Sequence, residues 1–284
     1  MRLRQCRIGI AGLGLMGGSL GLALDGKCRI RVGHDRVAAA ATRAVESGAV
    51  DRAAPDLDAM AGEIDLLVAA TPVGSIPALM ARLGELCDGP DHVMDLGSSK
   101  RVVIEAMSRL PRRYSAIGGH PMCGRETSGI DAADGDLFRG AVFVLTPLPR
   151  TAAETSELAR EMAEAVGARP VVLDADTHDC VAAVVSHAPY LVAAALAESA
   201  RLAPMDVGSL AAAGFRDTTR LAASNVEMMR DVLTSNRDEV IDALARFAAT
   251  LDGLAEQLRA SDDNALEASL ERIRSWRRDL FERG

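Results

Sequence analysis

The feature of this chain that most constrains its fold is a strand-like run near the N-terminus that passes directly into closely spaced glycines and an apolar helix. We expect the strand over residues 7–11, followed by Gly12, Gly14 and Gly17, with residues 19–24 apolar enough for a buried helix. In this order Gly12 makes a tight turn, Gly14 lets the backbone approach a pyrophosphate, and Gly17 lets helix and strand pack closely. The order of these elements predicts a dinucleotide site.

The residues around these glycines refine the choice of cofactor. The helix start at Leu15 and Met16 offers unpaired backbone N–H groups to phosphates. A second strand-like run ends at Asp35, 23 residues after Gly12, where a carboxylate can accept hydrogen bonds from the adenine ribose. That carboxylate repels a 2′-phosphate and favours NAD over NADP, although Arg36 beside it is able to hold the extra phosphate. The alternative is a glycine-rich turn in an unrelated α/β protein.

Two further strand-like runs end in polar segments. Residues 64–70 lead to Thr71 and Pro72, and residues 92–95 lead to Ser98 and its neighbours. Ligands of open parallel sheets bind outside the carboxyl ends of the strands, so Thr71 and Pro72 are candidate cofactor contacts. Ser98 is a candidate active-site residue, and it is equally well explained as a helix cap.

The next segment concentrates chemically active side chains. A short strand, residues 115–117, leads into a glycine-rich loop from Gly118 to Gly129, which contains His120, Arg125 and Glu126. Glycines permit positive-φ paths and a close approach to a ligand, and loops are the usual location of functional residues. We therefore expect this loop, with its histidine and its two charged residues, to be a site of chemistry. The alternative is a plain turn with a surface histidine.

The composition of the chain changes near Asp174. No strand-like alternation follows this residue, and alanine-rich helical patterns continue to the end. We expect an α/β fold with a Rossmann dinucleotide-binding domain over residues 1–174 and an all-α domain over residues 175–284. A last helix over residues 263–281 has the apolar spacing of a packing or dimer face.

Two histidines lie on the first helix of this second domain. His178 and His187 are nine residues apart, which is two and a half α-helical turns. We therefore expect them to face opposite sides and not to share one site, unless Pro189 distorts the helix. Each is equally well explained as a partly buried structural residue.

A compact polar cluster over residues 214–220 is expected to interrupt the later helices. It contains Asp217 and Arg220 and a further arginine. Guanidinium groups bind carboxylates in a bidentate fork, so this cluster suits a dicarboxylate ligand. The alternative is a helix cap at Asp217 with solvated arginines.

Composition excludes several classes of protein. The formal net charge of −8 argues against general nucleic-acid binding. Five cysteines without a CxxC pair favour a reducing compartment and free thiols. The chain enters a strand soon after Met1, which leaves no room for a signal peptide. It contains no run of about 18 apolar residues, so we expect no membrane span. We expect a cytoplasmic protein without a metal centre.

Taken together, the motifs resemble those of the prephenate/arogenate dehydrogenase family, the enzymes of tyrosine biosynthesis. The matching segments, in order along nearly the whole chain, are GLGLMGGSLGLAL, ATPV, DLGSSK, GGHPMCGRETSG, SHAPY and GFRDTTRLA. The resemblance implies a Rossmann domain followed by a helical domain that dimerises. It also implies oxidative decarboxylation of a cyclohexadienol with hydride transfer to NAD⁺, giving 4-hydroxyphenylpyruvate or tyrosine.

The same resemblance implies roles for individual residues. His120 matches the family's catalytic histidine, which accepts the proton of the ring hydroxyl, and Ser98 matches a serine that hydrogen-bonds this hydroxyl. His187 matches a histidine of the active-site wall, and Arg220 matches an arginine that binds a substrate carboxylate. The chain departs from the family at Arg125, where a small hydroxyl residue is common.

Substrate preference and two competing functions stay open at this stage. Asp217 beside Arg220 would favour the ammonium-bearing side chain of arogenate over the keto side chain of prephenate. Fused mutase and regulatory modules are not expected. A β-hydroxyacid dehydrogenase would need a catalytic lysine after the sheet, and residues 174–284 contain none. A non-enzymatic NAD sensor would need neither His120 nor the arginine cluster.

Overall fold

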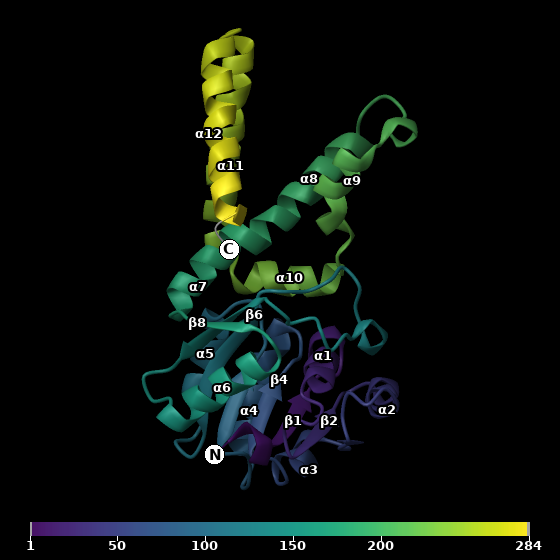
Figure 1. Ribbon diagram of the computed structural model, residues 1–284, viewed down its shortest axis with the longest axis vertical. Coiled ribbons are helices and arrows are strands. Elements are labelled where there is room, and N and C mark those ends of the chain that lie inside the picture. Colours follow the sequence, from purple (N-terminus) through teal and green to yellow (C-terminus); the bar gives the residue numbers. More distant parts are fainter. Residues whose placement is uncertain (1, 283–284) are drawn as a thin grey trace. The chain divides into compact units, whose positions relative to one another are not determined.

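The computed structural model describes residues 2–282, and the chain divides after Arg237 into two compact units (Figure 1). The first unit is built on one eight-stranded sheet. Its strands are β1 (Arg7–Ala11), β2 (Ile30–His34), β3 (Arg52–Ala53), β4 (Leu66–Ala69), β5 (His92–Asp95), β6 (Ser115–Pro121), β7 (Val142–Pro147) and β8 (Arg169–Val172).

The strand order is β3-β2-β1-β4-β5-β6-β7-β8. All neighbouring strands are parallel except β6 and β7, which are antiparallel. The direction of strand succession reverses at β1, which pairs with both β2 and β4. In such a sheet the crevice at the carboxyl ends of these strands is the usual ligand site. The predicted Rossmann arrangement is confirmed.

Helices cover both faces of the sheet, because its central strands are apolar on both sides. The helices are α1 (Leu15–Ala23), α2 (Ala38–Glu46), α3 (Leu57–Ala61), α4 (Ile76–Glu85), α5 (Arg101–Ser108) and α6 (Ala153–Ala165). One buried apolar cluster joins the sheet to α1, α2 and α6. The other joins it to α3, α4 and α5.

Strand β6 is longer than the sequence indicated. We expected residues 115–117 to be the strand and the segment from Gly118 to be a loop, but β6 continues to Pro121 and pairs with β7, with His120 opposite Val144. The antiparallel partner supplies the backbone hydrogen bonds that a loop would lack. Within the segment only Gly129 has a positive φ, so conformational freedom does not explain its first glycines.

After the sheet the chain is helical, and residues Ala175–Arg201 form one continuous helix (Figure 1). It consists of α7 (Ala175–Ala182), a π-helical segment (Ala183–His187) and α8 (Ala188–Arg201). By length and composition alone this helix could cross a membrane, but core helices of water-soluble proteins meet the same criteria. The absence of a membrane span therefore stays an expectation.

The segment that we expected to interrupt the helices is itself helical. Residues Ala213–Thr219 form α9, followed by a 3-10 turn (Arg220–Ala223) and α10 (Val226–Ser235). Asp217 lies inside α9, so its alternative role as a helix cap is wrong. Helix α10 packs on the 3-10 turn Val73–Ser75, which follows β4.

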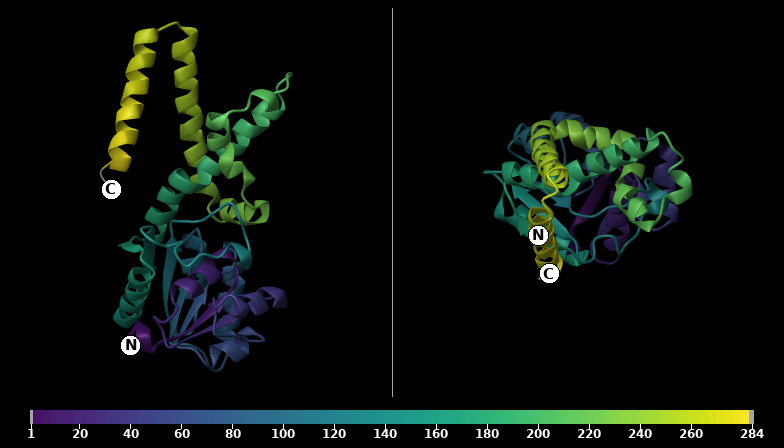
Figure 2. Two further views of the ribbon diagram at one scale, coloured as in Figure 1. Left: turned by 45° about the vertical axis from the view of Figure 1, so that its right-hand side comes forward. Right: turned by 90° about the horizontal axis from the view of Figure 1, so that it is seen from above.

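The second unit is a helical hairpin. It contains α11 (Arg237–Arg259) and α12 (Asp263–Glu282), which run antiparallel (Figure 2). Ser261, with a φ of 53°, makes the sharp turn between them. The predicted last helix is therefore confirmed.

Candidate active site

Gly12 and Gly17 have the turn and packing geometry that the sequence predicted, and Gly14 leaves open the space in which we expect a pyrophosphate. Gly12 has a φ of 95°, and a Cβ there would lie 2.7 Å from the Ala70 carbonyl oxygen. A Cβ at Gly17 would overlap the Gly12 carbonyl, so this glycine is needed for helix packing. Gly14 precedes the first residue of α1, and a Cβ there would meet no protein atom within 4 Å. The space beside Gly14 and the N–H groups of Leu15 and Met16 therefore fits a pyrophosphate.

Asp35, which we expect to contact the ribose, directly follows β2. The two carboxylate oxygens of Asp35 accept hydrogen bonds from the backbone N–H groups of Leu13 and Val37, each at 2.8 Å. These bonds hold the carboxylate beside the glycine turn, and each oxygen retains a lone pair for a ribose hydroxyl. Arg36 is exposed next to it.

Thr71 and Pro72 follow β4 at the same edge of the sheet. The backbone N of Thr71 lies beside Gly12, 2.8 Å from the position of a Cβ there. The Thr71 hydroxyl oxygen is buried without a hydrogen-bond partner among residues 2–282. A buried hydroxyl without a partner is destabilising, so this atom is a candidate ligand contact.

His120 is the outer member of a chain of three buried side chains. Its Nδ1 lies 2.8 Å from Nε2 of His178 on α7, and Nδ1 of His178 lies 2.7 Å from Oδ1 of Asp179. His120 is 8% exposed, His178 2% and Asp179 0%. Strand β6 and helix α7 therefore bring together residues 58 positions apart.

The hydrogen-bond roles in this chain follow from the carboxylate. Asp179 also accepts from the backbone N–H groups of Lys100 at 2.6 Å and Arg101 at 2.9 Å. Burial alone would raise the pKa of Asp179, but the hydrogen bonds from His178 and from these N–H groups hold its pKa below the usual value. The ionised carboxylate accepts from Nδ1–H of His178, whose Nε2 then accepts from Nδ1–H of His120. Nε2 of His120 is left as a proton acceptor.

The surroundings keep His120 uncharged. Burial lowers its pKa well below the ordinary value, and the charges of His178, Lys100 and His187 act in the same direction. A neutral imidazole with a free Nε2 is the form that can accept a proton.

A buried ion pair holds the strand next to His120. Lys100 is fully buried, and its ammonium group pairs with the buried carboxylate of Asp95 and donates to the Gly119 carbonyl oxygen at 2.7 Å. Asp95 also accepts from the Gly119 N–H at 2.9 Å. A Cβ at Gly119 would lie 3.1 Å from the Phe143 ring and still closer to the Asp95 carbonyl, so this glycine permits close packing.

His178 and His187 do join one cluster, which we expected only if Pro189 distorts the helix. The π-helical segment between them advances each residue by a smaller angle than an α-helix. Pro189 lacks the N–H that would bond to the carbonyl four residues earlier, which accounts for the distortion. His187 is fully buried, and its Nδ1 lies 3.1 Å from Nδ2 of Asn236, directly after α10.

The serines after β5 have different surroundings. Ser98 is half-buried, and no hydrogen bond to its hydroxyl is found among the described residues. The Ser99 hydroxyl donates to Ser235 of α10 at 2.8 Å. Neither serine caps α5, because Asp179 accepts from the N–H groups at the start of that helix. The capping alternative is therefore wrong.

The charged residues that we expected to contact substrate lie further out. Arg220 forms an ion pair with Glu126, and Arg125 forms one with Asp134. The Arg220 side chain is 60% exposed. Asp217 is exposed, and its nearest cationic partner is Arg216 at 3.9 Å. The structure thus brings His120, His187 and Ser98 to the carboxyl edge of the sheet and leaves Arg125 and Asp217 outside the buried cluster.

Sequence reasoning missed three of the buried residues that surround His120 and His187. Asp179, Asn236 and Lys100 were not among our candidates, and His178 was considered without a role. The adjacent His178–Asp179 pair at the start of an apolar helix was a usable signal, whereas nothing in the sequence connects Asn236 to it. The five cysteines form no disulfide, and no group of metal-ligating side chains is found among residues 2–282.

Comparison with known proteins places this geometry in a family. Residues 20–172 match the family model for the prephenate dehydrogenase nucleotide-binding domain, and residues 174–272 match the model for the prephenate dehydrogenase dimerization domain. Prephenate dehydrogenase of Bacillus subtilis is 34% identical over 283 residues, covering 95% of this chain and 75% of that protein.

Solved structures give the same result. The crystal structure of prephenate dehydrogenase from Aquifex aeolicus with hydroxyphenyl propionate and NAD⁺ superposes with a TM-score of 0.89 at 28% identity, covering 99% of this chain and 98% of that one. The Synechocystis arogenate dehydrogenase superposes with a TM-score of 0.81 at 30% identity, covering 96% and 99%. The ordered motifs, the fold and both domain matches therefore lead to one conclusion: this chain belongs to the prephenate dehydrogenase family.

Proposed function

We propose that this protein oxidatively decarboxylates prephenate, arogenate or both, with hydride transfer to NAD. The products are 4-hydroxyphenylpyruvate and tyrosine respectively, with CO₂. The observation that carries the proposal is the buried chain His120–His178–Asp179, which leaves a neutral imidazole nitrogen free at the carboxyl edge of a dinucleotide-binding sheet. Family membership supports the same reaction.

The residues that would hold the cofactor fit it well. The start of α1 and the open space at Gly14 would receive the pyrophosphate, and Asp35 would accept from the adenine ribose. Thr71 and Pro72 would lie beside the nicotinamide end. When bound, NAD⁺ supplies the hydride acceptor. NADP is the weaker alternative, because the Asp35 carboxylate repels a 2′-phosphate.

His120 is the proposed base. Its Nε2 accepts the proton of the ring hydroxyl as the hydride leaves the same carbon and a carbonyl forms. The ring carboxylate then leaves as CO₂, its bonding electrons make the ring aromatic, and His120 returns the proton to the phenolate oxygen. His178 and Asp179 hold the required tautomer throughout, in the manner of a histidine–carboxylate pair behind a catalytic base. Ser98 is the proposed hydrogen-bond partner of the hydroxyl.

Individual cationic side chains must attract the dicarboxylate substrate, because the net charge of −8 does not attract an anion. Arg220 is the proposed carboxylate ligand, with Arg125 as a second candidate, and His187 lies on the wall of the site. In this structure both arginines pair with acidic residues, Glu126 and Asp134. A substrate carboxylate would bind Arg220 in place of Glu126 or beside it. Glu126 is therefore proposed to lie next to the bound substrate.

We propose that Asp217 biases the choice between the two substrates. It precedes Arg220 by three residues, a spacing that puts side chains on one helix face. Its carboxylate would favour the ammonium group of arogenate. An unchanged ratio of kcat/KM for arogenate and prephenate in Asp217→Asn would refute this assignment.

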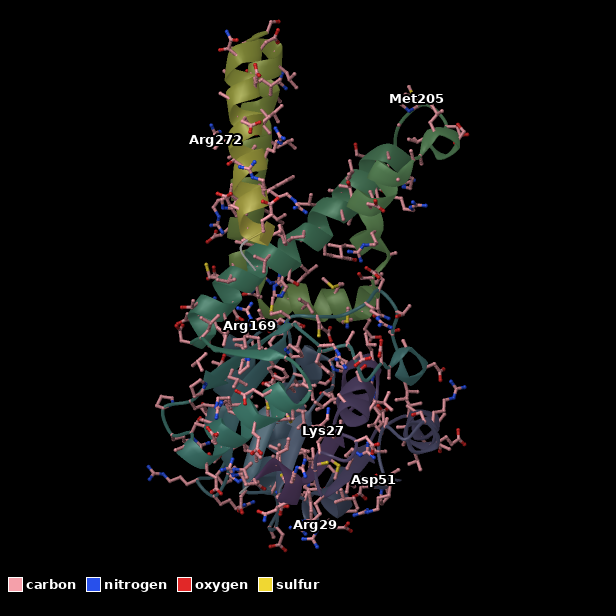
Figure 3. The ribbon with its side chains drawn as sticks, viewed as in Figure 1. Lys27, Arg29, Asp51, Arg169, Met205 and Arg272 are labelled. Atoms are coloured by element: carbon pink, nitrogen blue, oxygen red, sulfur yellow. The ribbon has the colours of Figure 1, made fainter. Side chains whose placement is uncertain are left out.

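A homodimer formed through the helical domain is also part of the proposal. Large apolar side chains are exposed on α11 and α12, namely Ile241, Phe247, Leu251, Leu270, Trp276 and Leu280. Met205, at the outer end of the α8–α9 connection in Figure 3, is 70% exposed. Surfaces of this kind commonly mark protein interfaces. We expect the protein to lie in the cytoplasm and to have no nucleic-acid partner.

The direct test of function is NADH formation with prephenate and arogenate in parallel, together with the CO₂ released. One CO₂ for each NADH with at least one substrate supports the proposal. NAD binding without turnover of either would favour the non-enzymatic sensor. Turnover of β-hydroxy acids instead would favour the other dehydrogenase class, which neither matched family model represents.

A further inference from the structure

Asn236 makes two contacts that fix its orientation. It is 3% exposed, and its Nδ2 lies 2.8 Å from the backbone carbonyl oxygen of Asp179 and 3.1 Å from Nδ1 of His187. A backbone carbonyl can only accept a hydrogen bond, so the amide atom that faces it must be the NH₂ group. The acceptor carbonyl of Asp179 therefore determines which way the amide of Asn236 faces.

This orientation determines the tautomer of His187. One hydrogen of the NH₂ group bonds to the Asp179 carbonyl, and the other points to Nδ1 of His187. That nitrogen must then carry a lone pair, so the proton of the neutral ring lies on Nε2. The Asn236 amide thus favours the Nε2–H tautomer of His187 over the Nδ1–H tautomer.

The Ser98 backbone lies close enough to the His187 ring to act on its pKa, but no group of residues 2–282 is in hydrogen-bonding geometry with Nε2. This nitrogen is buried without a hydrogen-bond partner, and the same is true of Oδ1 of Asn236 among the described residues. A buried N–H donor without an acceptor is destabilising. A ligand oxygen at this position would satisfy it, and the ring belongs to the cluster that contains His120.

Burial keeps the His187 ring neutral. Burial lowers the pKa of His187 to about 4, His178 acts in the same direction, and Asp179 and the Ser98 backbone oppose it. The Asp179 carboxylate is already engaged by His178 and by the N–H groups at the start of α5. His120 on β6 is the other titratable group coupled to this ring.

We propose that Asn236 is a positioning residue that holds His187 as an uncharged Nε2–H donor to a substrate oxygen. This inference rests on the proposed decarboxylation, in which a carboxylate loses its negative charge. A cationic histidine would stabilise the charged ground state and slow that step, whereas a neutral donor orients the substrate at a smaller cost. Asn236 supplies this neutral donor because an amide, unlike a carboxylate, donates to Nδ1.

The tautomer can be observed without turnover. In the full-length protein labelled with ¹⁵N-histidine, long-range ¹H–¹⁵N spectra report which ring nitrogen is protonated, and His187→Gln identifies the resonances of His187. We expect a single Nε2–H tautomer that is unchanged between about pH 6 and about pH 8. A wild-type ring protonated on Nδ1 would overturn the proposal.

A variant that introduces a negative charge tests the consequence. In Asn236→Asp the carboxylate accepts from Nδ1, so the proton should move to Nδ1 and kcat should fall roughly 10²-fold, the usual loss for one preorganised donor. Asn225→Asp is the matched control at the other end of α10. Asn225 Oδ1 accepts from the Met228 N–H at 2.9 Å as a helix cap, a role that aspartate fills equally well.

Two safeguards keep the test decisive. If Asn236→Asp does not fold, Asn236→Ala removes the amide without adding charge and should give a mixture of tautomers with a smaller loss of kcat. Unchanged kcat in the folded variants would refute the proposal. A wild type that turns over neither substrate but shows the Nε2–H tautomer would refute the proposed function and leave the amide–histidine geometry intact.

Discussion

The cofactor crevice and the histidine cluster are built in opposite ways. The crevice uses backbone geometry from one stretch, Gly12 to Asp35, in which the absence of a Cβ at three glycines leaves room for turn, ligand and helix. The cluster uses side chains from β6, α7, the π-helical segment and α10, joined by hydrogen bonds across the chain. The first should therefore be most sensitive to volume added at the glycines. The second should be most sensitive to a change in the charge or hydrogen-bonding capacity of its side chains.

Among the residues that support His120, the largest effect is expected from Asp179→Asn, which removes the charge at the inner end of the cluster. An amide can donate to His178 and reverse the tautomers along the chain, so kcat should fall about 10³-fold, within the range for loss of general-base catalysis. The affinity for NAD should not change, because Asp179 lies outside the crevice.

Asp176→Asn is the matched control on the same helix. Asp176 is 81% exposed and pairs with Arg101 at the surface. Steady-state kinetics and NAD titration of both variants sharpen the comparison. Equal kcat values in Asp179→Asn and Asp176→Asn would contradict the assigned role of the buried carboxylate.

The next effect concerns pH and stability. Burial holds the pKa of His187 at about 4 instead of 6.5, so between these values the unfolded chain binds a proton that the folded chain does not. Unfolding free energy should therefore fall as the pH falls from about 6.5 to about 4, with a contribution from His187 of about 3 kcal/mol. His120 acts in the same direction.

Urea unfolding at about pH 7 and about pH 4 measures this term as the difference between wild type and His187→Gln. The variant should lose less stability on acidification than the wild type. His34→Gln, in strand β2 outside the cluster, is the matched histidine substitution. If all three proteins lose the same stability, the buried neutral state of His187 is wrong.

The smallest expected effect belongs to the crevice. Gly14→Ala adds a methyl group where no protein atom lies within 4 Å, at an ordinary φ of −83°, so the protein should fold normally. The dissociation constant of NAD should nevertheless rise about tenfold, because the methyl group occupies space expected for pyrophosphate. At saturating NAD, kcat should be close to that of the wild type.

Gly62→Ala is the control, since a Cβ there is also in open space and Gly62 has a φ of −71°. Calorimetric titration with NAD⁺ separates the two variants. Equal affinities would mean that the open space at Gly14 does not receive the cofactor.

The same contrast explains what the sequence could predict. The glycines and Asp35 are recognisable because their roles depend on spacing within one βαβ unit, and the sheet follows from apolar runs. The length of β6 was underestimated because pairing with β7 is not a local property of Gly118–Pro121. The spacing of nine residues placed His178 and His187 on opposite sides because the calculation assumed a regular α-helix, whereas the structure has a π-helical segment between them.

Asn236 shows most clearly what the sequence alone could not predict. It follows α10 by one residue and would ordinarily be taken for a helix-terminal polar residue. Its proposed role depends on contacts with Asp179 and His187, 57 and 49 positions earlier in the chain. No spacing rule covers such a contact, so only the folded structure indicates it. The domain boundary at Asp174 stays a proposal, supported by family-model ranges that meet between residues 172 and 174.

The most direct test of the account is turnover of prephenate and arogenate by wild type and His120→Asn, each at saturating NAD⁺ confirmed by titration. We predict NADH formation by the wild type with at least one substrate. In the variant kcat should fall by a factor between about 10² and about 10⁴, with unchanged NAD affinity, because the general base is lost. Turnover in His120→Asn equal to that of the wild type would show that the free imidazole nitrogen at the end of β6 is not the base, and would contradict the central claim.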